Sequence, residues 1–226
     1  MRKNEVDQHL LNEYLFDFIT QERKQRFIEV IQQRTRYLTV VIENLYQSHN
    51  TSAVLRTCDC FGIQDVHIIE NKNKYNINDE IAMGSSNWLN IHHYNQSDNN
   101  TPLCIDTLKQ KGYTIVATTP HKNDCLLENL KIDQKIALVF GTEKDGLSQA
   151  AINGADAFVK IPMLGFTESF NISVSAGIFL HYLTNKIRNN AIDWQLSNYE
   201  QEEILLEWLK ISIKSSKSLI ESFLKK

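Results

Sequence analysis

The chain has 226 residues and a mass of 26.2 kDa, which fits one α/β domain with short appendages. Its composition, 42% hydrophobic and 23% charged, excludes wholesale disorder, and no apolar run approaches the roughly 20 residues of a membrane span. The net charge of −3 means that a nucleic-acid partner must be held by local basic patches.

The cysteines and the first residues both indicate a cytoplasmic protein. The opening MRKNEVDQHLLNEY lacks the apolar core of a secretory signal. The four cysteines show no disulfide-framework spacing and are expected to be reduced thiols: Cys58, Cys60, Cys104 and Cys125. Cys58 and Cys60 have no second cysteine pair to complete a tetrahedral site, so no metal is expected.

Apolar runs alternate with helical patterns in the middle of the chain. Runs of mostly apolar residues predict strands at 38–42, 66–69, 113–117, 136–140 and 157–161, with a weaker candidate at 88–94. Helical patterns lie at about 51–61, 101–111, 147–154 and 172–188. Since the strands lack strict alternation, they are expected to be buried on both faces. The sequence therefore predicts an α/β fold, a mostly parallel sheet with helices on both faces. Ligands of such sheets bind beyond the carboxyl ends of the strands.

The first segment of interest after a strand runs from Asn50 to Gly62. Asn50 or Thr51 could cap a helix that Gly62 closes at its C-terminal end. Capping does not account for Arg56, which lies within the helix with few acidic neighbours. Arg56 is therefore either an ordinary surface residue or a functional one.

The second segment, Phe140–Gly146, has a glycine at each end of a four-residue polar turn. It is not a Walker loop, because no Lys-Ser/Thr follows the second glycine. Two interpretations remain open: a turn that needs two unusual φ angles, or a backbone loop that approaches a ligand closely.

The third segment, Ile161–Gly177, has a long loop before a helix that begins near Asn171. Ser169 and Asn171 are good N-cap residues, but the loop is longer than a cap requires. The small residues from Ser173 to Gly177 predict that another part of the chain passes close to this helix.

Together these segments resemble the three motifs of the SpoU–TrmH family (SPOUT superfamily) of RNA 2′-O-ribose methyltransferases. The matching patterns, in order over about 37–185, are Asn50-x-x-Ala-x-x-Arg56, Phe140-Gly-x-Glu-Lys-x-Gly146 and Ile161-Pro-Met with Ser169-x-Asn-x-Ser-Val174. The resemblance implies that the C-terminal part of the sheet domain forms a deep trefoil knot that holds S-adenosylmethionine.

The resemblance also implies roles for individual residues. The positions expected to line the cofactor site are Thr118, Gly141, Ile161, Met163 and Phe170. The family's catalytic positions correspond to Asn50, Arg56, Glu143, Ser169 and Asn171. One departure is Glu168-Ser-Phe170, where related sequences commonly have Gln-Ser-Leu; Phe170 is the larger apolar wall.

The expected reaction is in-line attack of a ribose 2′-oxygen on the sulfonium methyl group. By resemblance, Arg56 contacts the hydroxyl. Because a guanidinium stays protonated in proteins, we assign Arg56 a fixed positive charge that holds a phosphate and stabilises developing alkoxide. Asn50 would orient Arg56 or the ribose, and Glu143 would anchor its loop or the arginine.

The resemblance implies a homodimer and no metal. A phosphate-binding NTPase would need a Walker lysine, which is missing. A non-catalytic RNA-binding protein of this fold remains an alternative.

The preferred substrate is tRNA, with a guanosine ribose in the D-loop as target, over ribosomal RNA. Ribosomal members often carry a separate N-terminal domain, whereas residues 1–36 are too few for an independent core. The chain is thus expected to comprise a helical extension (1–36), the methyltransferase domain (37–188) and a second helical extension (189–226).

The C-terminal extension carries a candidate RNA-binding stripe. An apolar helical face is expected from Ile204, Trp208, Ile211 and Leu219. Lys210, Lys214 and Lys217, spaced i, i+4 and i+7, form a separate basic stripe that Lys225 extends. The stripe is either a solvated helix face or a track for RNA phosphates.

Overall fold

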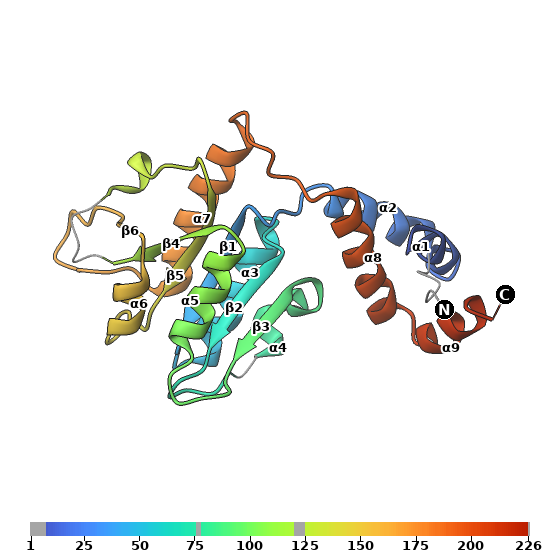
Figure 1. Ribbon diagram of the computed structural model, residues 1–226, viewed down its shortest axis with the longest axis horizontal. Helices are drawn as coiled ribbons and strands as arrows, with labels where there is room; N and C mark the ends of the chain where they lie inside the picture. The colour runs from blue at the N-terminus through green and yellow to red at the C-terminus, as the bar shows by residue number, and fades with distance from the viewer. Residues whose placement is uncertain (1–7, 76–77, 120–124, 226) are drawn as a thin grey trace. The chain divides into compact units, whose positions relative to one another are not determined.

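The structure, a computed structural model, describes residues 8–75, 78–119 and 125–225 (Figure 1). The chain divides into two compact units. One unit is Thr35–Trp194, and the other joins the described residues before Thr35 with those after Trp194. From the sequence we expected two separate extensions, whereas in the structure the described residues of both ends form one unit. Among the described residues, no helix is long and apolar enough to cross a membrane.

The larger unit is built on a six-stranded sheet in which every neighbouring pair is parallel. The strands are β1 (Leu38–Glu43), β2 (Asp65–Ile69), β3 (Asn90–Tyr94), β4 (Tyr113–Thr118), β5 (Lys135–Phe140) and β6 (Ala157–Val159), in the order β3-β2-β1-β5-β4-β6. Ile42 lies opposite Ile68 and Phe140, so β1, β2 and β5 end at one edge of the sheet. The predicted parallel sheet is confirmed.

Helices cover both faces of this sheet, as Figure 1 shows. On one face, side chains such as Val40 pack against α3 (Ser48–Cys60) and α7 (Ile172–Arg188). On the other face, Val41 packs against α5 (Thr101–Gln110), which contacts α6 (Gln149–Gly154). Because successive side chains of a strand point to opposite faces, a continuous apolar run supplies both cores.

Some element boundaries differ from those predicted. Trp88 belongs to a 3₁₀ helix, η1 (Ser85–Trp88), that follows Gly84 in a left-handed conformation with φ 74°. A short α4 (Asp79–Ala82) and a second 3₁₀ helix, η2 (Leu127–Asn129), were not predicted. The last strand ends at Val159 rather than residue 161, and beyond it Lys160 forms a parallel bridge with Leu126.

The α5-covered face also holds a polar cluster that the sequence did not indicate. Asp65 accepts hydrogen bonds from Arg36 Nε and His92 Nε2, both at 2.7 Å. Burial would raise the pKa of Asp65, but these two partners outweigh it and lower that pKa. His67 stacks on His92 with ring centroids 4.5 Å apart, and burial together with His92 lowers the pKa of His67 to about 3. His67 is therefore held neutral inside the sheet.

The smaller unit contains α1 (Gln8–Phe16), α2 (Gln21–Ile31), α8 (Asn198–Ser212) and α9 (Ser216–Phe223). Buried Asn12 donates to the backbone oxygen of Glu202 at 2.9 Å, which links α1 to α8. Phe27 meets Trp208 edge-on at 5.4 Å, which links α2 to α8. Both links join residues from opposite ends of the sequence.

Candidate functional site

Asn50 lies in the first turn of α3, directly beyond the end of β1. The sequence suggested that Asn50 or Thr51 caps this helix, and this was wrong: α3 begins at Ser48, and its N-cap position is Gln47, which makes no side-chain capping bond. Asn50 is only 4% exposed, and its side chain is directed to other segments of the chain.

Three polar side chains from three different segments form a hydrogen-bonded group, which we call the Asn–Glu–Asn cluster: Asn50, Glu143 and Asn171. Asn50 Nδ2 donates to Glu143 Oε1, and Asn171 Nδ2 donates to Asn50 Oδ1 at 3.2 Å. Asn171 is also the N-cap of α7, where its Oδ1 accepts from Ser173 N at 2.9 Å. Its position is therefore fixed by the helix that it caps.

The loop that carries Glu143 folds back on itself as a tight turn. Thr142 N donates to Gly146 O at 2.9 Å, and Gly146 N donates to Thr142 O at 3.1 Å. Gly146 has a φ of 67°, which favours glycine. A Cβ on Gly141 would lie 2.3 Å from the carbonyl carbon and oxygen of Gly146. The two glycines thus serve different needs: one an unusual φ, the other close approach of two backbone segments.

Glu43, the last residue of β1, anchors the far side of the same loop, a role that was not predicted from the sequence. Its buried carboxylate accepts from Thr101 Oγ1 and from Ser148 Oγ, both at 2.6 Å, and from Ser148 N at 2.8 Å. Ser148 in turn caps α6. The carboxylate therefore connects β1 to the start of α6, directly after the loop.

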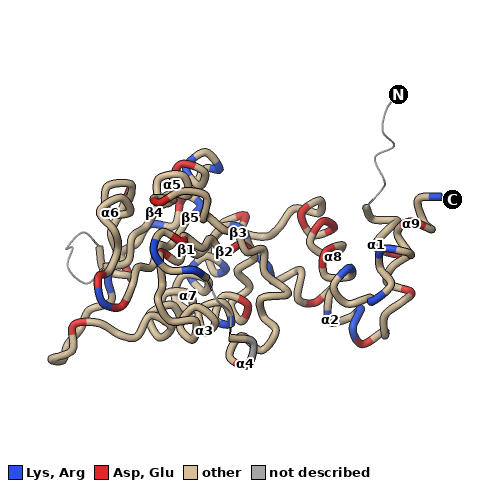
Figure 2. Tube along the Cα trace, turned by 90° about the horizontal axis from the view of Figure 1, so that it is seen from below, with Lys and Arg blue, Asp and Glu red and all other residues tan. Residues whose placement is uncertain are grey.

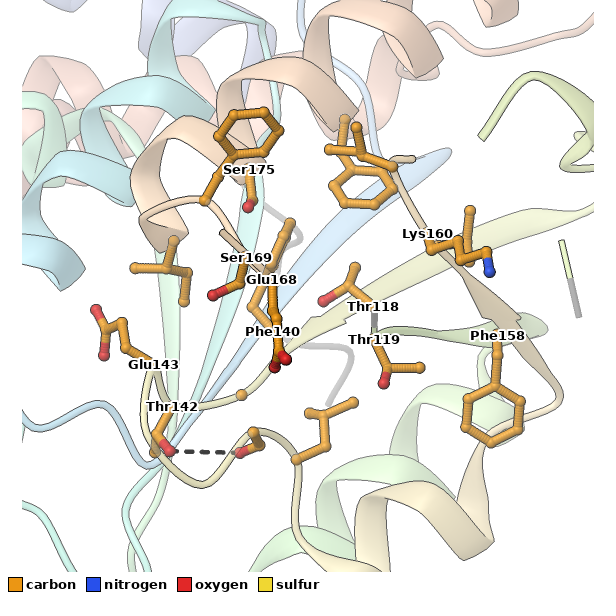
Figure 3. Close-up of a pocket in the computed structure, with 18 of the residues that line it drawn as sticks. Thr118, Thr119, Phe140, Thr142, Glu143, Phe158, Lys160, Glu168, Ser169 and Ser175 are labelled. Atoms are coloured by element: carbon orange, nitrogen blue, oxygen red, sulfur yellow. Dashed lines mark hydrogen bonds between the residues drawn. The ribbon is translucent and has the colours of Figure 1, made fainter. Parts of the chain in front are cut away.

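A pocket of about 420 Å³ opens beside the loop, within the size range of small-molecule sites (Figure 3). All five residues expected to line a cofactor site line it: Thr118, Gly141, Ile161, Met163 and Phe170. Glu143 and Ser169 also line it, and Phe140 and Phe179 add apolar walls. The pocket thus adjoins the Asn–Glu–Asn cluster through Glu143.

Arg56 is the predicted catalytic residue that stands apart. It lies on the exposed side of α3, and no hydrogen bond or ion pair links it to the residues that the structure describes. It is also not among the residues that line the pocket. The structure brings Asn50, Glu143 and Asn171 together and places Ser169 in the pocket wall, but it does not bring Arg56 to them.

The lysine stripe does not lie on one helix, so that prediction was wrong. α8 ends at Ser212, Lys214 lies in the following turn, and Lys217 belongs to α9. Lys210 Nζ pairs with Glu207 at 2.6 Å. Ile211, expected on the apolar face, is 53% exposed. Acidic positions recur along α8, as Figure 2 shows.

Solved structures with the same fold are methyltransferases of the SpoU type. The Aquifex aeolicus TrmH/SpoU tRNA modifying enzyme matches with a TM-score of 0.76 and 30% identity, over 85% of this chain and 97% of that chain. The parallel sheet and its edge pocket therefore define an α/β methyltransferase domain. The chain belongs to the SpoU rRNA methylase family, whose family model matches residues 37–181.

Two curated relatives match almost the whole chain. A tRNA (guanosine(18)-2′-O)-methyltransferase of Borreliella burgdorferi is 43% identical over 201 residues, which are 89% of this chain and 90% of the relative. A protein of the same name from Thermus thermophilus is 31% identical over 194 residues, 84% of this chain and 97% of the relative. The family recognised from the three motifs is confirmed.

Proposed function

We propose that this protein transfers a methyl group from S-adenosylmethionine to the ribose 2′-oxygen of guanosine 18, in the D-loop of tRNA. The observation that carries the proposal is the pocket, whose five expected lining residues lie next to the Asn–Glu–Asn cluster. The two relatives named for this activity, which align along most of the chain, support the choice of tRNA and guanosine.

The pocket fits the proposed cofactor in size and in chemistry. Apolar side chains, among them Phe140, Phe170 and Phe179, offer surfaces for the adenine and for the methionine stem. The cofactor would be held by the residues expected from the sequence: Thr118, Gly141, Ile161, Met163 and Phe170. When bound, S-adenosylmethionine supplies an activated methyl group, so this chain chiefly has to align the acceptor and manage its proton.

The cluster orients the acceptor ribose. Asn50, which itself accepts a hydrogen bond from Asn171, holds the Glu143 carboxylate in the pocket lining, where it can accept a hydrogen bond from a ribose hydroxyl. Ser169, which lines the same pocket, also positions the ribose. Arg56 lies on the exposed side of α3 and outside the pocket lining, so its guanidinium is available to bind a phosphate of the RNA.

We also propose that the protein works as a homodimer whose RNA groove both chains form. Leu164 and Phe166 are fully exposed, and Val174 on α7 is half exposed, so this region presents apolar surface that a second copy would cover. Light scattering at micromolar concentration should give twice 26.2 kDa. A mass of one chain would refute the dimer.

Two further features complete the proposal. The trefoil knot is expected in the C-terminal part of the sheet domain. There, the residues after β6 lie alongside 125–127: Leu127 N donates to Lys160 O, and Lys160 N donates to Cys125 O. A cytoplasmic location suits a tRNA substrate, and the four cysteines are free thiols.

The deciding experiment measures methyl transfer to total tRNA and to ribosomal RNA in separate reactions, followed by mapping of the modified nucleotide. We expect transfer to tRNA at guanosine 18. Transfer to ribosomal RNA alone would favour the family's other substrate class. Cofactor binding by calorimetry with no transfer to either RNA would favour a non-catalytic RNA-binding protein.

The lysines of the α8–α9 region remain a proposed contact for RNA phosphates, now as a patch around a turn rather than a helical stripe. Changing Lys210, Lys214 and Lys217 to glutamine should weaken tRNA binding and flatten its dependence on salt. Cofactor affinity should be unchanged. Unaltered tRNA affinity with an unaltered salt slope would show that these lysines are only solvated surface residues.

A further inference from the structure

Two acidic side chains that line the pocket, Asp145 and Glu168, are not used by the proposed mechanism. The ionisable residues that line the pocket are Glu143, Lys144, Asp145, Lys160 and Glu168. Glu143 is held by Asn50, whereas Glu168 makes no hydrogen bond or ion pair with the described part of the chain. Figure 3 shows the Glu168 side chain extending from the loop before α7 into the pocket. Its carboxylate is therefore available to a ligand.

The position of Glu168 in the pocket indicates which part of the cofactor it meets. Glu168 directly precedes Ser169, and Asn171 two residues further on bonds to Asn50. This stretch therefore borders the side of the pocket where the Asn–Glu–Asn cluster receives the ribose. In-line transfer would require the methyl group of a bound donor to face that ribose, so Glu168 would lie near the sulfonium that carries it.

The sulfur is also the atom whose charge changes in the reaction. The carbon–sulfur bond to the methyl group breaks, a carbon–oxygen bond to the ribose forms, and the hydroxyl proton leaves. S-adenosylmethionine carries a sulfonium charge, whereas the product S-adenosylhomocysteine is a neutral thioether with the same ammonium, carboxylate and adenosine groups. A carboxylate near the sulfur therefore distinguishes the two ligands electrostatically, because only the donor carries a charge on that atom.

We propose that Glu168 is a specificity-determining residue that favours the charged donor over the neutral product. This inference rests on the proposed function. Before transfer, the carboxylate attracts the sulfonium; after transfer, that attraction is gone, which weakens the hold on the product. Because the product lacks this attraction to Glu168, it dissociates more easily, and a new molecule of S-adenosylmethionine can replace it.

The test compares the affinities of the two ligands by isothermal titration calorimetry. Glu168→Gln keeps the shape of the side chain and removes its charge. We expect the Kd of S-adenosylmethionine to rise about threefold to fivefold, the size typical of a charge pair at a solvent-accessible site. The Kd of S-adenosylhomocysteine should change less than twofold. In the wild-type protein, high salt should reduce the difference between the Kd values of the two ligands, because it screens the charge of Glu168.

Asp145→Asn is the matched control, because Asp145 is an exposed carboxylate that lines the same pocket from the loop after β5 rather than from the loop before α7. It should leave the ratio of the two Kd values unchanged. An unchanged ratio in Glu168→Gln, or equal weakening of both ligands, would overturn the inference. If the Kd of S-adenosylhomocysteine divided by that of S-adenosylmethionine fell equally in both variants, the inference would also be overturned. The effect would then come from the overall negative charge of the pocket rather than from Glu168. If the wild-type protein bound neither ligand, the proposed function itself would fail.

Discussion

Alanine at position 141 would put a methyl group where the turn has no room for one. The added Cβ would lie 2.3 Å from the carbonyl of Gly146, and this neighbour is backbone rather than a movable side chain. The clash is relieved only if the turn opens, which breaks the two hydrogen bonds between Thr142 and Gly146. At about 1 kcal/mol each, their loss disfavours the closed loop by about 2 kcal/mol. Since the closed loop forms a wall of the pocket, cofactor affinity should fall about 30-fold.

Calorimetry with S-adenosylmethionine would measure this effect, with Gly165→Ala as the matched control. A Cβ on Gly165 meets nothing within 4 Å, so that variant should bind the cofactor with a Kd within about twofold of the wild-type value. Circular dichroism would establish that both variants are folded. A wild-type Kd for Gly141→Ala would show that the turn absorbs the methyl group without opening, and the assigned role of Gly141 would be refuted.

Three further predictions concern other buried polar groups. Because burial and His92 lower the pKa of His67 to about 3, the unfolded chain gains a proton below about pH 6.5 that the folded chain does not. Urea denaturation should therefore show a stability loss of about 2 kcal/mol between pH 8 and pH 5 that His67→Phe abolishes; an equal loss in the variant would exclude His67 as its source. Glu43→Gln replaces an acceptor of three hydrogen bonds by a group that must also donate, and should lower the free energy of unfolding by about 2 to 3 kcal/mol, whereas an unchanged denaturation midpoint would contradict this role. Asn50→Ala removes the hydrogen bond that holds Glu143 and should slow methyl transfer to tRNA at least about tenfold. Because Asn50 does not line the pocket, the Kd of the cofactor should stay within about twofold of the wild-type value. A rate of methyl transfer equal to that of the wild-type protein would exclude an orienting role for Asn50.

The strands were predictable because each core run supplies side chains to both faces of the sheet. Such a run is mostly apolar, and β1, β4 and β5 stand out in the sequence for that reason. Helix starts were less predictable. Asn50 has a strong local preference for capping, but its hydrogen bonds reach Glu143 and Asn171, which are 93 and 121 positions away. Local propensity carries no information about such distant partners.

Isolated polar residues in apolar strands were missed for a related reason. Glu43 and His67 each interrupt or end a β-branched run, and alone they look like exposed positions at the margin of a strand. Their burial depends on hydrogen-bond partners from other elements: Ser148 donates to Glu43, and the Tyr94 hydroxyl lies within hydrogen-bond distance of His67. A carboxylate at the end of a central strand is the signal that would have identified Glu43.

The break between α8 and α9 was hidden because no glycine or proline marks it. The stretch from Ile211 to Ser216 is rich in serine and β-branched residues, which are weak helix formers that compete for backbone hydrogen bonds. In the structure, Ser216 Oγ donates to Lys210 O at 3.0 Å and so ties the turn back onto α8. Residues spaced i, i+4 and i+7 lie on one face only if a single continuous helix contains all of them.

The smaller unit has a consequence for how the protein is made. Its helices come from opposite ends of the chain, so the surfaces of α1 and α2 that pack on α8 stay uncovered until α8 has left the ribosome. During synthesis, the whole sheet domain can fold while the first helices wait with apolar surface exposed. Bringing α8 to α1 and α2 closes a loop that contains the whole sheet domain. The entropic cost of closing such a loop slows folding, but this cost rises only slowly with the length of the loop. The residues of α8, which are translated after the sheet domain, thus complete the folding of α1 and α2.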